Sequence, residues 1–341
     1  MEYNPRTVSE HPMHFQNAGT FRRYFIVGGA GFIGSHFVDR LLADAGVAAV
    51  TLYDNFSSGR EWHYEHHLSD SRLKVIRDDV GNLPALTSAM AGHDVVIHLA
   101  SNPDIARAVT EPEIDFYQGT LLTNNVIEAM RRTRVPRLLY ASGSGVYGEI
   151  GSTEAYEDLG PLIPVSTYGA SKLAGEALIS SYCSMFGLSA RVFRFGNVVG
   201  PRQTHGVGFD FVRRLRADPT ELRILGDGKQ SKSYIHVYDV VAAVLCANNC
   251  EPSGFRAFNV ATGDYITVTE IADLAVEILG LQTPPRYRYT GGDRGWKGDV
   301  PIVRLNTDRI QSLGWKCERN CREALKQSII SLSEDERTNH E

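Results

Sequence analysis

A glycine-rich loop between a short apolar run and a helical pattern constrains this chain more than any other feature. It reads Tyr24-Phe-Ile-Val-Gly-Gly-Ala-Gly-Phe-Ile-Gly34. Gly29, Gly31 and Gly34 satisfy GxGxxG, and Gly28, Gly31 and Gly34 satisfy the variant GxxGxxG. Such glycines allow a tight turn and close approach to a pyrophosphate, and the following helix N-terminus offers free N–H groups to phosphates. The loop predicts a dinucleotide site at the start of an α/β domain.

Apolar runs and helical patterns alternate beyond the loop. Strands are expected at 24–27, 49–53, 74–77, 95–99, 137–141 and 190–195, and helices at 33–45, 83–90, 114–132 and 168–186. Strand, helix and strand at this spacing form right-handed βαβ units and a parallel sheet. The predicted class is α/β, a Rossmann-like doubly wound parallel sheet with a smaller α/β substrate-binding lobe.

The rhythm changes near residue 197, where Gly and Pro become frequent and the apolar runs shorten. We expect a flexible N-terminal extension at 1–21 and a polar tail at 331–341. Between them we expect a dinucleotide-binding domain and a smaller substrate-binding lobe. The domain comprises 22–196 plus 236–263, the second part returning as a helix and a strand, and the lobe comprises 197–235 plus 264–330.

Composition excludes several classes of protein. The net charge is −5 and no block of Lys and Arg forms a phosphate-binding footprint, which argues against a nucleic-acid partner. No apolar run approaches the ~18–20 residues of a membrane span. The five cysteines are scattered without nearby histidines, so we predict reduced thiols in a cytoplasmic protein and no metal centre.

Two acidic residues follow the second and third expected strands. Asp54 stands 20 residues after Gly34. A carboxylate there accepts the ribose hydroxyls and repels a 2′-phosphate, which favours NAD over NADP. Asp79 is placed to contact the adenine.

Tyr168-Gly-Ala-Ser-Lys172 opens the helix after the fifth expected strand. Residues four apart share one helix face. A nearby ammonium and an oxidised nicotinamide both favour the phenolate of a tyrosine, so Tyr168 can serve as a general base near neutral pH. Lys172 is also placed to bind the nicotinamide ribose.

These motifs resemble the extended short-chain dehydrogenase/reductase family, in particular its nucleotide-sugar epimerases of the UDP-glucose 4-epimerase type. The resemblance covers residues 22–330. Besides the features above, it rests on Asp54-Asn-Phe-Ser-Ser-Gly59, His98-Leu-Ala100, Val146-Tyr-Gly148, Asn197-Val-Val-Gly-Pro-Arg202, Gly226-Asp-Gly-Lys-Gln230, Tyr234-Ile-His-Val and Gly295-Trp-Lys-Gly-Asp299.

The resemblance implies a tightly retained NAD, with Tyr168 taking the proton of a sugar hydroxyl, and a homodimer formed through 114–132 and 168–186. The implied NAD contacts are Gly28, Gly31, Phe32, Ile33, Gly34, Asp54, Asn55, Ser58, Gly59, Asp79, Val80, Leu99, Ala100, Ser101, Tyr168 and Lys172. The implied contacts to a substrate linked to UDP are Ser144, Tyr168, Asn197, Arg202, Lys232, Tyr234 and Arg294.

One departure concerns the catalytic hydroxyl. Where the family carries a Ser or Thr before Val-Tyr-Gly, this chain has Gly143, flanked by Ser142 and Ser144. Either serine, or a water in the vacated space, is a candidate replacement. A second departure is Asp115-Phe-Tyr-Gln-Gly-Thr120, which stands where the family commonly has an Asn.

The segment before Val146 also separates reaction types. The sugar-nucleotide dehydratases carry an Asp-Glu pair there, and this chain has Ser144-Gly145. Without an acid for the leaving hydroxyl, dehydration is disfavoured. The favoured function is therefore a UDP-hexose 4-epimerase acting through a transient 4-keto sugar. The alternatives are an epimerase at another carbon, a ketoreductase on a keto-sugar nucleotide, and a catalytically silent NAD-binding regulatory protein.

Overall fold

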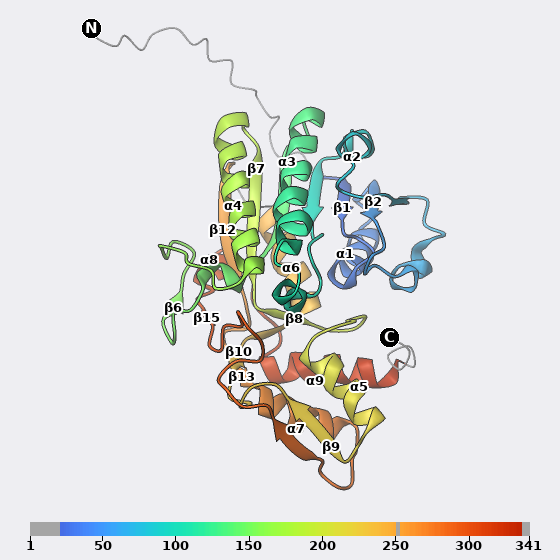
Figure 1. Cartoon of the computed structure of the whole chain (residues 1–341). Helices are drawn as coiled ribbons and strands as arrows, with labels where there is room; N and C mark the ends of the chain where they lie inside the picture. Colours follow the sequence, from blue (N-terminus) through green and yellow to red (C-terminus); the bar gives the residue numbers. More distant parts are fainter. Residues whose placement is uncertain (1–20, 250–252, 336–341) are drawn as a thin grey trace, which may run out of the picture.

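The computed structural model describes residues 21–249 and 253–335 (Figure 1). Most of the expected N-terminal extension and the last six residues of the expected polar tail lie outside these ranges. The start of the tail was predicted wrongly, because helix α9 (Cys321–Glu334) continues through residues 331–334. A capping box formed by Asn320 and Glu323 begins this helix, and Leu332 is buried. Burial of an apolar side chain in its last turn explains why the helix runs on.

The described residues contain a seven-stranded parallel sheet, as the sequence predicts. Its order is β12-β7-β5-β4-β1-β2-β3. The strands are β1 (Arg23–Val27), β2 (Ala49–Asp54), β3 (Leu73–Arg77), β4 (Val95–His98), β5 (Arg137–Gly143), β7 (Ser189–Phe195) and β12 (Phe255–Val260). Most of these strands read as apolar runs because helices cover both faces of the sheet. The edge strand β3 is only partly buried.

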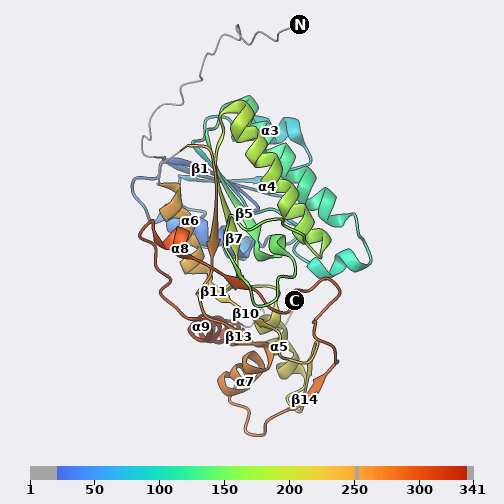
Figure 2. The same ribbon diagram turned by 90° about the vertical axis from the view of Figure 1, so that its left-hand side faces the viewer.

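Two separate hydrophobic clusters fill the two sides of the sheet. One joins α1 (Phe32–Leu42) and α6 (Val237–Asn248) to the strands. The other joins α2 (Leu83–Met90), α3 (Leu121–Thr133) and α4 (Thr167–Phe186), and Figure 2 shows α3 and α4 side by side. These layers make a doubly wound fold.

The chain order reverses between β1 and β4. From β1 the chain adds β2 and β3 on one side, and then crosses to β4 on the other. Ligands of such sheets bind beyond the carboxyl ends of the strands at this switch point. Here it brings the loop after β1 against the loop after β4, since a Cβ added to Gly28 would lie 2.8 Å from the Ala100 nitrogen.

Two expected helices differ from the observed ones. The helix expected at 33–45 ends at Leu42, shortly before Gly46. The helix expected at 114–132 opens with a π-helical turn, η4 (Phe116–Thr120), before α3. π-turns insert an extra residue into a helix and are frequent at functional sites.

A smaller body, which includes α5 (Val207–Ala217), α7 (Val268–Ile278) and α9, lies below the sheet in Figure 1. Its core lies among these three helices. Four two-stranded pairs accompany it: β11 (Tyr234–His236) with β8 (Asn197–Val199), β10 (Ser231–Lys232) with β13 (Ile266–Thr267), β14 (Arg286–Tyr289) with β9 (Glu221–Ile224), and β15 (Arg304–Leu305) with β6 (Glu154–Ala155).

Short elements complete the described chain. The single-turn helices are η1 (Glu61–His63), η2 (Glu65–His67), η3 (Ile105–Val109), η5 (Ser144–Tyr147) and α8 (Asp308–Gln311). Among the described residues, no helix is both long and apolar enough to cross a membrane.

Candidate active site

The glycine loop forms a cradle that only glycine can build. Gly28 has φ +78°, a backbone conformation that L side chains rarely adopt, and its N–H donates to the Tyr53 carbonyl at 2.9 Å. A Cβ on Gly34 would lie 2.5 Å from the Gly28 oxygen. Gly31 is the N-cap of α1, and no side chain caps that helix end. Its first N–H groups are therefore available to a pyrophosphate.

Asp54 lies buried at the end of β2 beside this cradle. Its carboxylate accepts hydrogen bonds from the N–H groups of Ala30 at 3.0 Å and Phe56 at 2.8 Å. Burial raises the pKa of Asp54, although the two N–H donors oppose the shift. A carboxylate has about four acceptor positions, so two stay available for ribose hydroxyls. Gly59 packs against it, since an added Cβ would lie 3.0 Å from Asp54 Oδ1.

The other predicted NAD contacts surround this corner of the sheet. The Asn55 amide donates to Asp79 Oδ2 at 2.7 Å. The N–H groups of Leu99 and Ala100 donate to the Val27 carbonyl. Phe32, Ile33, Ser58 and Val80 lie in the first turn of α1, in the loop after β2 and after β3. The structure thus gathers this predicted set at one edge of the sheet.

Tyr168 and Lys172 lie on the first turns of α4. The N-cap Ser166 accepts from the Gly169 N–H at 3.1 Å, and Gly169 packs directly on Gly145. Lys172 is buried, and its ammonium donates to the Ala141 carbonyl at 2.9 Å. That nitrogen lies 5.5 Å from the centre of the Tyr168 ring. The predicted pair is therefore adjacent in space.

Burial dominates the electrostatics of this pair. It raises the pKa of Tyr168 to about 12, against a hydrogen bond from Ser101 and with a contribution from Asp115. It lowers the pKa of Lys172 to about 8, against the attraction of Asp115 and Glu176. A lysine of this kind is held near the border between charged and neutral at physiological pH, where small changes in its surroundings alter its charge.

The two serines beside Gly143 have different surroundings. The Ser142 hydroxyl donates to Glu176 Oε1 at 2.6 Å, and Glu176 is paired with Arg194 at 2.7 Å, all three being buried. This network commits Ser142 to the protein interior and argues against the predicted catalytic role for it. Ser144 begins η5, so the extended backbone ends at Gly143. A Cβ at Gly143 would meet no atom within 4 Å.

The sequence did not predict that Ser101 and Asp115 influence the pair of Tyr168 and Lys172. Ser101 follows β4 and hydrogen-bonds to Tyr168, although the sequence marked it only as an NAD contact. Asp115 is buried, and it accepts hydrogen bonds from Asn102 at 2.9 Å and Thr167 at 2.7 Å. Its place in a segment that departs from the family pattern was the available signal.

Predicted substrate contacts gather in two groups. The register of β8 and β11 places exposed Asn197 opposite buried Tyr234. Lys232 forms an ion pair with Asp299. Arg294 contacts Glu149 with two 2.8 Å hydrogen bonds from Nη2, and its Nη1 donates to the Asp299 carbonyl at 3.1 Å. The two cations therefore share one acidic neighbourhood.

Arg202 is placed differently from the other predicted substrate contacts. Its guanidinium donates to Asp39 Oδ2 on α1 at 2.6 Å. Its backbone has φ +65°, in the left-handed region. This contact ties the loop before α5 to the helix that follows the glycine cradle, and it uses the charge that was predicted to bind substrate.

Comparisons with known proteins agree with this geometry. The fold and the cradle define a Rossmann-type, NAD-binding α/β enzyme, and the model of the NAD dependent epimerase/dehydratase family matches residues 24–261. The chain belongs to that family, and its cofactor is NAD. The resemblance found in the sequence is thereby confirmed.

Individual relatives match along nearly their whole length. The UDP-glucose 4-epimerase of Mycolicibacterium smegmatis is 32% identical over 90% of this chain and 97% of its own. The crystal structure of a UDP-galactose 4-epimerase has 36% identity and a TM-score of 0.80, covering 92% of this chain and 99% of that one. The Thermus thermophilus UDP-glucose 4-epimerase, solved with NAD, has 30% identity and a TM-score of 0.80, covering 91% and 98%.

Proposed function

We propose that this protein interconverts the C4 epimers of a UDP-hexose, of the UDP-glucose and UDP-galactose type, through a transient 4-keto sugar. One observation carries the proposal: the buried ammonium of Lys172 lies 5.5 Å from the centre of the Tyr168 ring. Lys172 also contacts the carboxyl-terminal part of β5, and the glycine cradle follows the carboxyl end of β1 in the same parallel sheet. Bound NAD supplies the hydride acceptor and donor there. The three relatives described above, each matched along nearly its whole length, are named as 4-epimerases of UDP-glucose or UDP-galactose.

Tyr168 takes the proton of the sugar C4 hydroxyl. The charge of Lys172 stabilises the phenolate, and Lys172 is held in place by the Ala141 carbonyl. With burial holding the phenol pKa at about 12, Tyr168 needs this positive charge and hydrogen-bond donors to act near neutral pH. Ser101 already donates one, and Ser144, at the start of η5, is placed to position the sugar hydroxyl.

A group of polar side chains on the smaller body binds the nucleotide diphosphate. Lys232 and Arg294 bring two positive charges, and Asn197 and Tyr234 lie opposite one another nearby in the fold. Guanidinium donors suit phosphate oxygens because they are fixed in charge and multidentate. In this state Arg294 is paired with Glu149, so the diphosphate takes over a cation that a carboxylate holds before substrate arrives.

The segment before Val146 supports epimerisation over dehydration. Elimination of a hydroxyl needs an acid beside the leaving group. Residues 143–147 contain no carboxylate, and Glu149, which follows them, is paired with Arg294. Simple epimerisation needs one base and one hydride carrier.

A homodimer through α3 and α4 is part of the proposal. Phe116 and Tyr117 in η4 and Leu121 at the start of α3 are exposed apolar side chains close together in the chain. Neighbouring exposed apolar side chains are a feature of interaction sites. A cytoplasmic location fits the four cysteines of the described chain, which are free thiols.

Proton NMR of the purified protein tests the reaction. UDP-glucose, UDP-N-acetylglucosamine, UDP-glucuronate and GDP-mannose are incubated separately without added cofactor. We expect the anomeric signal of UDP-galactose to grow in the UDP-glucose sample until the ratio is constant. A different epimer would move the reaction to another carbon, and NADH consumption with a keto-sugar nucleotide would identify a ketoreductase.

Tyr168→Phe tests the assignment of the base, with Tyr182→Phe as its match on the same helix. The Tyr182 hydroxyl contacts only Glu128 at the surface, at 3.3 Å. We expect Tyr168→Phe to lose about 10²–10⁴-fold in kcat while NAD stays bound, because only the proton transfer is removed. Equal rates for the two variants would refute Tyr168 as the base, and an inactive wild type that retains NAD would favour a silent NAD-binding protein.

A further inference from the structure

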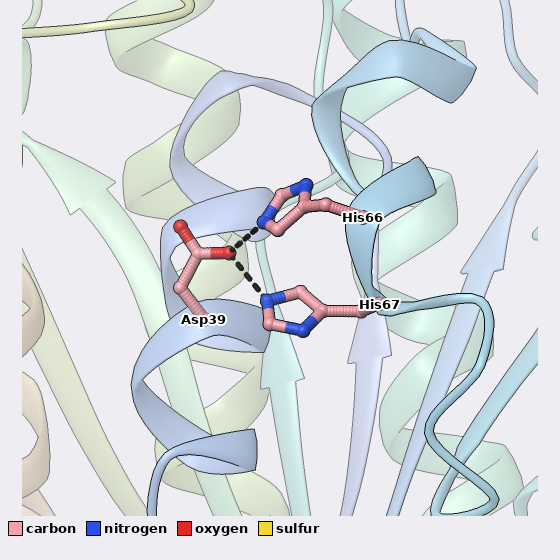
Figure 3. A group of neighbouring side chains, drawn as sticks. All are labelled: Asp39, His66 and His67. Atoms are coloured by element: carbon pink, nitrogen blue, oxygen red, sulfur yellow. Dashed lines mark hydrogen bonds and ion pairs between the residues drawn. The ribbon is translucent and has the colours of Figure 1, made fainter.

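Three side chains from two distant segments converge outside the site described above (Figure 3). Asp39 lies near the end of α1, and His66 and His67 lie on η2, the turn between β2 and β3. His66 Nε2 is 3.0 Å and His67 Nε2 is 2.8 Å from the same oxygen, Asp39 Oδ1. Two imidazoles and a carboxylate are a common donor set for zinc and related ions.

The spacing of the donors suits such an ion. Bonds of about 2.05 Å in a tetrahedral zinc site place neighbouring donor atoms about 3.3 Å apart. The distances from Asp39 Oδ1 to His66 Nε2 and His67 Nε2, 3.0 and 2.8 Å, are shorter than this value by about 0.3 and 0.5 Å. A metal ion would enter after side-chain shifts of a few tenths of an ångström. His66 and His67 would then lose their Nε2 protons to solvent and carry a proton on Nδ1 instead.

A buried histidine, His36, lies beside the second oxygen of Asp39. Its side chain is 1% exposed. Its Nε2 lies 2.9 Å from the Pro201 carbonyl and must donate to it, which leaves Nδ1 as an acceptor. Nδ1 has no hydrogen-bond partner and lies 3.7 Å from Asp39 Oδ2, the oxygen that accepts from Arg202.

The two carboxylate oxygens of Asp39 have different partners because Arg202 binds only one of them. It donates to Oδ2 at 2.6 Å and leaves Oδ1 to the two histidines. A hydrogen bond to the second oxygen orients a ligating carboxylate. The guanidinium also cancels the charge of Asp39, so the imidazole nitrogens must supply most of the affinity. This disfavours Mg²⁺ and Ca²⁺, which prefer several oxygen donors.

We propose that Asp39, His66 and His67 form a binding site for a divalent transition-metal ion of the zinc class, with Arg202 orienting the carboxylate. The sequence predicted no metal centre because Asp39 lies 27 residues from His66, outside any metal-binding spacing. The ion would fasten α1, which follows the glycine cradle, to the turn that follows the Asp54 loop. Its role is structural, separate from the chemistry at Tyr168.

Metal titration of the full chain tests the site. The protein is stripped with EDTA and titrated with Zn²⁺ by calorimetry, and with Co²⁺ by visible absorption. We expect one tight site per chain, tetrahedral Co²⁺ bands and a rise in Tm, with no equivalent effect from Mg²⁺. His66→Gln and His67→Gln should each weaken this site at least tenfold.

Glu65→Gln is the matched control. Glu65 is exposed on the same turn as the two histidines, and it is not one of the three side chains that converge. It should bind as the wild type does, and the comparison cancels any metal bound by histidines elsewhere in the chain. His66 is half exposed, so His66→Gln is expected to fold even if His67→Gln does not. The proposal is overturned if the wild type shows no tight site, if the His66→Gln variant binds as the wild type does, or if Mg²⁺ competes equally.

Discussion

The Gly34→Ala substitution probes the glycine cradle with a single carbon atom. A Cβ at this position would lie 2.5 Å from the Gly28 oxygen, 2.7 Å from Gly29 Cα and 2.8 Å from the Gly29 oxygen. All three are backbone atoms of the loop after β1, so no flexible side chain can yield. Ordinary contact begins near 3.4 Å, which requires a retreat of about 0.9 Å between α1 and the loop.

Two magnitudes follow from that retreat. Overpacking costs about 1–3 kcal/mol, and replacing a helical Gly with Ala returns about 0.4–1 kcal/mol. We therefore expect a net loss of about 1 kcal/mol, and at most about 2.6 kcal/mol, in the free energy of unfolding, which lowers Tm by a few degrees. A phosphate contact displaced by most of an ångström is lost, and one charge-assisted hydrogen bond is worth about 1.5–3 kcal/mol. NAD should then bind about 10–100-fold more weakly.

Gly208→Ala is the matched control. Gly34 and Gly208 both lie in the first turn of an 11-residue helix, α1 and α5 respectively. A Cβ at Gly208 would meet only Ile329 Cγ1, at an ordinary 3.6 Å. The gain in helix propensity is therefore not opposed, and we expect this variant to equal or exceed the wild type in stability and to keep its NAD.

Three measurements decide the outcome: thermal unfolding without added NAD, the NAD content after gel filtration, and the dissociation constant for NAD of the stripped protein. Gly34→Ala is expected to change all three and Gly208→Ala none unfavourably. If Gly34→Ala keeps a full complement of NAD and an unchanged Tm, the loop does not cradle the pyrophosphate as argued.

Three further predictions rest on other residues. Lys172 has its pKa lowered to about 8, so between pH 8 and 10.5 the unfolded chain binds the extra proton and stability rises with pH. Lys172→Met lacks this titration, so its advantage over the wild type in the free energy of unfolding should shrink by up to about 3 kcal/mol between pH 8 and 10.5, as measured by urea unfolding. A difference that stays constant with pH would contradict the buried ammonium. Arg294→Ala should raise KM for the sugar nucleotide about 10–100-fold with a small effect on kcat, whereas Arg288→Ala, an exposed arginine on β14, should leave steady-state kinetics unchanged. Ser144→Ala should cost about 10²–10⁴-fold in kcat. Gly143→Ser should fold normally, because its backbone is extended and its Cβ position is open. Little change in Ser144→Ala, together with a gain in kcat from Gly143→Ser, would instead favour a water in that space.

The cofactor half of the fold was predictable because its signals are local. The spacing of Gly28, Gly31 and Gly34 predicts the geometry of the loop from only seven residues. Apolar runs identify the strands, and the right-handed rule for βαβ units then fixes their order well enough to place Asp54 beside the loop. Each of these inferences needs only neighbouring residues and a general rule of sheet topology.

The catalytic hydroxyls were less predictable because their roles depend on distant partners. The sequence leaves both Ser142 and Ser144 as candidates, and the buried pair of Glu176 and Arg194, which binds the Ser142 hydroxyl, argues against Ser142. Ser101 lies 67 residues before Tyr168, with which it forms a hydrogen bond. No rule of sequence spacing predicts that Ser101 and Tyr168 are close. Their proximity depends on the order of the strands in the sheet, which places the loop after β4 at the switch point.

The acidic partners of the substrate cations show why a binding site cannot be read from its cations alone. Sequence reasoning marked Lys232 and Arg294 for their positive charge, and the structure pairs them with Asp299 and Glu149. Neighbouring cations repel each other, so carboxylates beside them stabilise the folded chain without substrate. If Lys232 and Arg294 bind the diphosphate as proposed, the diphosphate must displace Glu149 rather than enter an open positive pocket. The proposal then implies discrimination against weaker anions, because a ligand with one negative charge would gain too little to break the pair of Arg294 and Glu149, whereas a diphosphate would contact both cations at once.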